Sequence, residues 1–68
     1  MKAVSGKALA RALEKRGWKP ARVSGSHHIY IKEDRIERVS VPIHGNQNLK
    51  IGLLTHLMKV AGLEEKDL

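Results

Sequence analysis

The chain carries four histidines and no cysteine, so histidine is the first residue type to consider for chemistry. His27 and His28 are adjacent in a segment with strand character, so their side chains should point to opposite faces and would not easily hold one metal ion. His44 lies in a polar segment and His56 in a predicted helix, without the i, i+4 histidine pair of zinc enzymes. The sequence therefore predicts no metal site and no other cofactor.

Nucleophilic catalysis and paired carboxylates gain no support from local spacing either. The serine and threonine side chains considered as nucleophiles are Ser24, Ser26, Ser40 and Thr55. None of them sits in the strained G-x-S-x-G elbow that exposes a catalytic serine. Three acidic side chains gather at a predicted hairpin, namely Glu33, Asp34 and Glu37. We interpret them as a solvated loop.

The charge balance points to a polyanionic partner. Thirteen Lys and Arg face seven Asp and Glu, which gives a formal net charge of +6. Three of the acidic residues lie in the tail, 64–68, so residues 1–62 carry +8. A domain this basic attracts polyanions through its long-range field and through counterion release. Charge favours a nucleic-acid partner, does not choose RNA over DNA, and leaves an acidic protein partner open.

The location follows from what the sequence lacks. No apolar run approaches the roughly 20 residues that cross a bilayer, and the apolar stretch at the N-terminus is too short for a signal peptide. The absence of cysteine fits a reducing compartment. We therefore expect a cytoplasmic protein without a membrane partner.

His27 directly follows Gly25 and Ser26 at the start of a predicted strand. Glycine allows a tight turn there, which would expose the first residues of the strand, so we assign Gly25 and Ser26 a motif-shaping role. A histidine in that position is able to move protons near neutral pH while cations hold a phosphate. Because RNA carries its own nucleophile in the 2′-hydroxyl, one well-placed base can start its cleavage without a metal.

The cations that flank this motif are candidate RNA ligands, and they are Arg22, Lys32 and Arg38. The residues alone still favour a simpler interpretation of His27 as an exposed strand residue. His28, His44 and His56 receive the same simple interpretation.

The first element that must position His27 is a helix predicted over residues 6–16. Ser5 suits its N-cap, Leu9 and Leu13 recur at i, i+4, and Gly17 suits the left-handed position after the helix. Pro20 makes residues 18–24 an edge or irregular strand.

Two further strands are predicted over residues 27–32 and 36–41, joined by a hairpin loop over 33–35 and ended by Pro42. After a polar loop over 44–48, apolar residues at helical spacing from Ile51 to Ala61 predict a second helix, with Gly62 as its C-cap. Three adjacent strands with short loops give an antiparallel meander.

The resulting order is α-β-β-β-α in a single α+β domain over residues 1–68. Two amphipathic helices on one face of a three-stranded antiparallel sheet would leave the other face open. We expect the helices to bury Leu9, Leu13, Leu54, Leu57 and Met58. Trp18 and Tyr30, the only aromatic residues, are expected in the core because a base-stacking platform needs more of them.

Several segments together resemble the HicA family of mRNA interferase toxins over nearly the whole chain. The matching segments are Lys7-Ala8-Leu9, residues 13–18, Gly25-Ser26-His27-His28-Ile29-Tyr30, Val41-Pro42-Ile43-His44 and residues 57–63. As a set, the G-S-H-x-x-aromatic motif, V-P-x-H and the closing A-G-L helix are fairly specific. Two departures concern local geometry: Leu53 stands where the family often has Thr, and Pro20-Ala21 interrupts the first strand.

The resemblance implies a fold like that of a double-stranded-RNA-binding domain. It also implies metal-independent RNA cleavage with the histidine of G-S-H, here His27, as the essential residue. A further implication is a HicB-like antitoxin that covers the active face. The alternatives that remain open are a non-catalytic RNA-binding module of the same fold and, last, a basic scaffold or DNA-binding protein without an obvious recognition helix.

Overall fold

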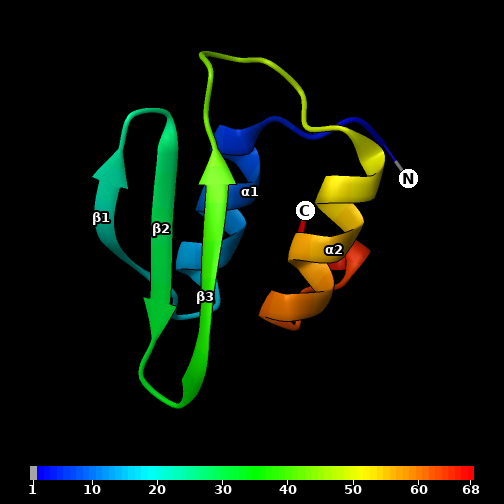
Figure 1. Ribbon diagram of the computed structural model, residues 1–68. Coiled ribbons are helices and arrows are strands. Elements are labelled where there is room, and N and C mark those ends of the chain that lie inside the picture. Colours follow the sequence, from blue (N-terminus) through cyan, green and yellow to red (C-terminus); the bar gives the residue numbers. More distant parts are fainter. Residues whose placement is uncertain (1) are drawn as a thin grey trace.

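A computed structural model describes residues 2–68, so Met1, which belongs to the predicted domain 1–68, lies outside the described residues. The elements are α1 (Gly6–Lys15), β1 (Lys19–Ser24), β2 (His27–Lys32), β3 (Arg35–Pro42), α2 (Ile51–Ala61) and a final 3-10 turn, η1 (Glu65–Asp67). The predicted α-β-β-β-α order is confirmed (Figure 1).

The three strands form one antiparallel sheet in the order β1-β2-β3. The register shifts between Pro20 and Arg22 on β1, so the Pro20-Ala21 interruption lies at a bulge. Every residue of β1 is exposed, as expected of an irregular edge strand. A second shift on β2 lies between Tyr30 and Lys32. The two irregularities leave His27 in a regular part of the ladder.

Strand β3 is longer than the sequence predicted, since it begins at Arg35 and includes Pro42. The Arg35 guanidinium donates to the Val60 carbonyl at 2.7 Å and lies over the Trp18 ring, 5.9 Å from its centroid. These contacts fix Arg35 in the strand. Pro42 is tolerated because it is the last residue of an edge strand, where a missing N–H costs little.

Local signals set the helix ends. The Ser5 hydroxyl accepts the Ala8 N–H at 3.1 Å and so caps α1. At the other end of α1, Arg16 is the C-cap, and Gly17 follows with a φ of 94°. Gly62 ends α2 in the left-handed conformation, and Leu63 N–H donates to the Met58 carbonyl at 2.9 Å.

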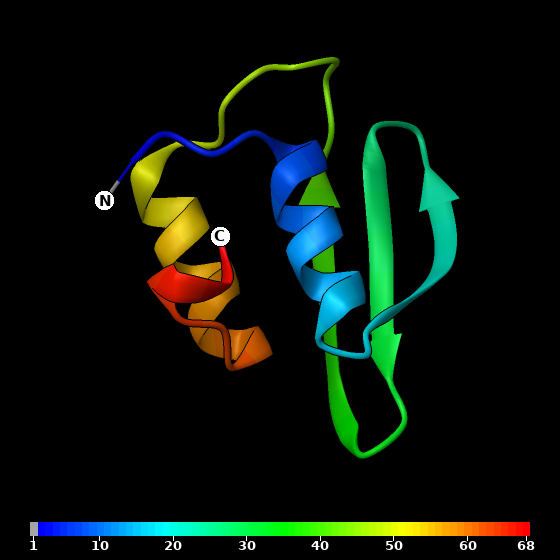
Figure 2. The same ribbon diagram turned by 180° about the vertical axis from the view of Figure 1, so that it is seen from behind.

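Helix α1 lies across one face of the sheet, while α2 lies beside α1 and along the β3 edge (Figures 1 and 2). The core between them contains every predicted core residue, namely Leu9, Leu13, Leu54, Leu57, Met58, Trp18 and Tyr30. The sheet adds Val39 and Val41, whose side chains are fully buried. The opposite face of the sheet is left open.

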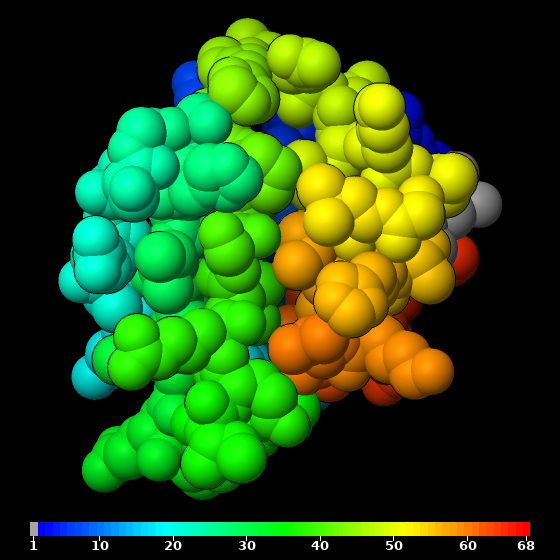
Figure 3. All heavy atoms as spheres, in the orientation of Figure 1, coloured from blue at the N-terminus to red at the C-terminus, as the bar shows by residue number. Residues whose placement is uncertain are grey.

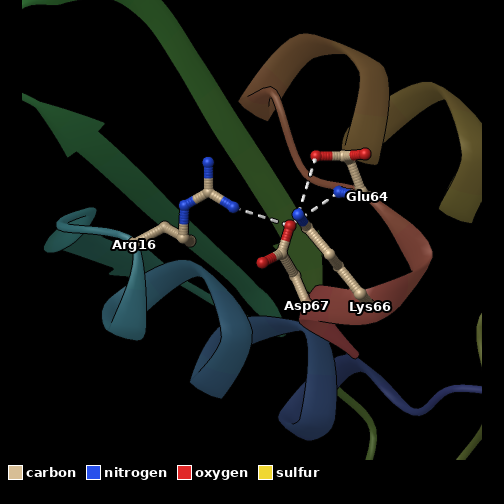
Figure 4. A network of polar contacts seen from close by, with 4 residues as sticks. All are labelled: Arg16, Glu64, Lys66 and Asp67. Atoms are coloured by element: carbon tan, nitrogen blue, oxygen red, sulfur yellow. Dashed lines mark hydrogen bonds and ion pairs between the residues drawn. The ribbon is translucent and has the colours of Figure 1, made fainter.

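The acidic tail folds back onto α1. The Asp67 carboxylate accepts the Glu64 backbone N–H and the Arg16 guanidinium, both at 2.7 Å, as Figure 4 shows. These two donors lower the pKa of Asp67 below its usual value, the backbone N–H more than Arg16. Leu68 packs against the core. Because Arg16 is far from Asp67 in sequence, the chain pattern alone gave no sign of this turn.

Candidate functional site

His27 is exposed at the first residue of β2, on the open face of the sheet. It lies opposite Ser24 on β1 and Pro42 on β3. Residues that face each other across an antiparallel pair project to the same side of the sheet. On β3 the buried Val39 and Val41 point to the helices, so Ser40 between them points to the open face with His27.

The turn before His27 has the character that the sequence predicts. Gly25 has a φ of 60°, and a Cβ there would meet no atom within 4 Å. Glycine is therefore favoured at residue 25 by the backbone conformation and not by close packing. The Ser26 carbonyl accepts the Ile43 N–H at 2.8 Å, which ties this turn to the end of β3. Gly25 and Ser26 thus form the turn that directly precedes His27 in β2.

Ser40 is the side chain that contacts the His27 ring. Its Oγ lies 3.4 Å from Nδ1 of His27, a long and therefore weak hydrogen bond. In the tautomer with its hydrogen on Nδ1, His27 donates to Ser40 and leaves Nε2 free to accept a proton. Sequence reasoning considered Ser40 only as a nucleophile. Its alternation with Val39 and Val41 was the signal that places it on the open face.

The candidate cations divide into two groups. Arg22 lies opposite Ile29, the next residue of β2 on the open face, and Arg38 precedes Ser40 by two residues on the same face. Both arginines are exposed. Lys32 lies at the far end of β2, roughly 17 Å along the strand from His27. The structure brings Arg22 and Arg38 to the face of His27 and does not bring Lys32 there.

Lys32 has its own surroundings at the β2–β3 hairpin. Its ammonium nitrogen lies 3.9 Å from an Asp34 carboxylate oxygen. A hollow opens on the protein surface at this hairpin. Its lining includes the exposed Ile31 and Ile36 together with Arg38. This hollow lies at the opposite end of the sheet from the Gly25–Ser26 turn.

The other three histidines of the described chain lie on different elements, and none of them contacts His27 by a hydrogen bond. His28 is half-buried and lies opposite the buried Val41, so its side chain points to the helix side, away from that of His27. His44 lies in the loop after β3, and His56 is exposed on α2. Within residues 2–68, no three histidine, aspartate or glutamate side chains are close enough together to hold a metal ion.

Comparison with protein families matches residues 6–63 to a family described as the HicA toxin of bacterial toxin-antitoxin systems. The chain belongs to this family. The match runs from the first residue of α1 to the residue after the α2 C-cap, and it includes Gly25, His27 and Ser40. A search of curated proteins found no match.

Membership of the HicA family confirms the resemblance seen in the sequence and makes the chain a toxin of a toxin–antitoxin system. The matched region contains all three strands and both α-helices. In the described part of this HicA chain, residues 2–68, no helix is long and apolar enough to span a membrane.

Proposed function

We propose that this HicA-family chain is a metal-independent endoribonuclease that cleaves messenger RNA, with His27 as the residue that moves protons. The observation that supports this proposal is the placement of His27. Its side chain is exposed on the open face of the sheet, contacts Ser40, and shares that face with Arg22 and Arg38.

The chemistry needs no group beyond RNA and the protein. His27 Nε2 accepts the proton of a 2′-hydroxyl, whose oxygen then attacks the adjacent phosphorus. The new 2′-oxygen–phosphorus bond forms as the bond to the 5′-oxygen breaks. The departing 5′-oxygen takes a proton from a protonated side chain of the protein, so the products are a 2′,3′-cyclic phosphate and a free 5′-hydroxyl end. Arg22, which lies opposite Ile29, neutralises charge on the phosphate as it reacts, and Arg38, four residues before Pro42 on β3, binds the RNA strand farther along the face.

The proposed partner is a HicB-like antitoxin that covers the face carrying His27. Residues 1–62 carry +8, so an inhibitor with acidic groups would meet this face quickly, while apolar contacts would slow its release. One protein bound there would block RNA binding and cleavage together, because both use the open face. Since the proposed substrate is messenger RNA, the proposal places this activity in the cytoplasm.

The test is cleavage of a short RNA in the presence of EDTA by the wild-type protein and by His27→Ala. We expect the wild type to give cyclic-phosphate ends and the folded variant to give none, with folding checked by circular dichroism. A folded His27→Ala protein that cleaves at the wild-type rate would refute the assignment. If the wild type binds RNA without cutting it, the chain is instead an RNA-binding module resembling a double-stranded-RNA-binding domain.

A further inference from the structure

A second hollow lies at the His27 end of the sheet. It is an open depression bordered by the end of β3, the loop over residues 43–50 and the first turn of α2, which lie together on the face seen in Figure 3. Its lining residues are Pro42, His44, Gln47, Asn48, Leu49, Lys50 and Leu53. Pro42 belongs both to this hollow and to the site, because it is the ladder partner of His27. The hollow therefore adjoins the face on which RNA would react.

The backbone brings His44 close to His27. Facing residues in an antiparallel pair have Cα atoms about 5 Å apart, and two further residues span at most about 7 Å, so the Cα atoms of His27 and His44 are within roughly 12 Å. Two backbone hydrogen bonds tie the loop over residues 43–50 to the rest of the fold. The Ile43 N–H donates to the Ser26 carbonyl and the Leu49 N–H donates to the Val4 carbonyl, each at 2.8 Å. Within the loop, the Gln47 N–H donates to the His44 carbonyl at 2.9 Å.

The side chains of this hollow suit an anionic ligand. His44 and Lys50 supply a proton donor and a positive charge, and Gln47 and Asn48 supply amide donors. The lining residues, all within the described part of the chain, include no acidic side chain. Exposed Leu53 adds an apolar surface at the rim, on the side of α2. This combination fits a phosphate with an attached nucleoside.

RNA cleavage needs a second proton transfer that His27 does not supply as a base. The 5′-oxygen must receive a proton as it leaves, because an alkoxide is a poor leaving group in water. A general acid positioned for such a step contributes about 10²–10⁴-fold to the rate. Of the histidines, His44 is the one that lines a hollow next to the His27 ladder pair.

We propose that this hollow receives the nucleotide on the leaving side of the scissile phosphate and that His44 protonates its 5′-oxygen. This inference rests on the proposed ribonuclease function. In the step, His27 accepts the 2′-hydroxyl proton and the His44 imidazolium gives its proton to the 5′-oxygen, while the phosphorus exchanges its 5′-oxygen for the 2′-oxygen. Lys50 binds the next phosphate along the leaving strand.

The test compares ordinary RNA with RNA in which sulfur replaces the bridging 5′-oxygen at one linkage. A thiolate leaves without protonation, so this substrate removes the need for a general acid. We expect His44→Ala to cleave ordinary RNA about 10²-fold more slowly than the wild type and to approach the wild-type rate on the sulfur substrate. His27→Ala should be slow on both substrates, since the base is still required.

Two further variants sharpen this comparison. His56→Ala removes an exposed histidine of α2 that is not part of the hollow, and it should match the wild type on both substrates. Lys50→Gln should raise KM for ordinary RNA with little change in kcat, because Lys50 binds the leaving strand and transfers no proton.

The proposal for His44 is overturned if His44→Ala cleaves ordinary RNA at the wild-type rate, or if it is equally slow on both substrates. Either result, with His27→Ala inactive, would leave the proposed ribonuclease function standing. A wild-type protein that cuts neither substrate would overturn both proposals.

Discussion

The carbonyl oxygen of Pro42, at the end of β3, lies so close to the Cα of Gly6 that a Cβ at residue 6 would overlap it. Gly6 is buried at the first position of α1. Because Pro42 is also the ladder partner of His27, this contact sets the end of β3 against α1 at the candidate site. A glycine outside the site thus determines where the site's backbone can lie.

Gly6→Ala should therefore destabilise the fold by about 1–3 kcal/mol through overpacking, although alanine is by itself the better helix former. It should also slow RNA cleavage, because the end of β3 must move. The matched control is Gly52→Ala in α2, where a Cβ meets no atom within 4 Å and should add about 0.5–1 kcal/mol of stability. Urea unfolding measures both, and a Gly6→Ala variant as stable as the wild type would contradict the close approach.

Expression of the chain should arrest growth of a bacterial host, and His27→Ala should relieve the arrest. His28→Ala is the neighbouring control, since its half-buried side chain points to the helix side and does not reach the open face. This control should lose some stability and keep its toxicity. Growth curves at matched expression levels provide the comparison. If only His28→Ala relieved the arrest, the reacting histidine would lie on the helix side of the sheet, and the assignment of His27 would be wrong.

Ser40→Ala should lower kcat of RNA cleavage by about 2–5-fold, because a hydrogen bond contributes about 0.5–1 kcal/mol and this one is long. Stability should barely change, since Ser40 is exposed. Ser24→Ala, on the other strand facing His27, is the matched control and should have a smaller effect. Equal rates for Ser40→Ala and the wild type would show that His27 needs no such support.

The affinity of the His27→Ala protein for RNA should fall steeply as the salt concentration is raised, because the basic residues within 1–62 bind phosphates. Adding Arg22→Gln or Arg38→Gln should reduce the slope of log affinity against log salt by about 0.7–0.9 for each phosphate that the variant no longer neutralises. Lys32→Gln tests whether the bound RNA extends to the hairpin end. Fluorescence anisotropy over a salt series gives the slopes, and an affinity indifferent to salt would contradict electrostatic binding.

Asp67→Asn should destabilise the protein at neutral pH and should lose this effect in acid. The backbone N–H of Glu64 and then Arg16 hold the pKa of Asp67 below its usual value. A carboxylate whose pKa is lowered by folding stabilises the fold when the pH is above its pKa in the unfolded chain, about 3.9. This contribution disappears as the pH falls through the lower pKa of the folded protein. Urea unfolding of both proteins at pH 7 and near pH 3 checks the trend. A stability difference unchanged by acid would rule out this role.

Local signals in the sequence were enough to predict the order of elements and the core residues, whereas His27 stood out from the other histidines only through the family resemblance. The Ser5 cap and the Leu9–Leu13 spacing define α1, and Gly62 ends α2. The turn at Gly25 is equally local, because it needs only a positive φ that glycine adopts freely. The family segments lie on these same elements, so fold and family were both readable from the chain.

The side chains that meet His27 depend instead on how the elements pack. Strand register is a relation between distant segments, and it alone brings Ser40 to the His27 ring and leaves Lys32 at the far end. The hollow beside Pro42 likewise needs the loop after β3 to fold against α2, and no local pattern specifies that. The Arg16–Asp67 pair joins residues 51 positions apart. Such side-chain contacts depend on how the helices and strands pack, and the spacing of residues along the chain does not specify that packing.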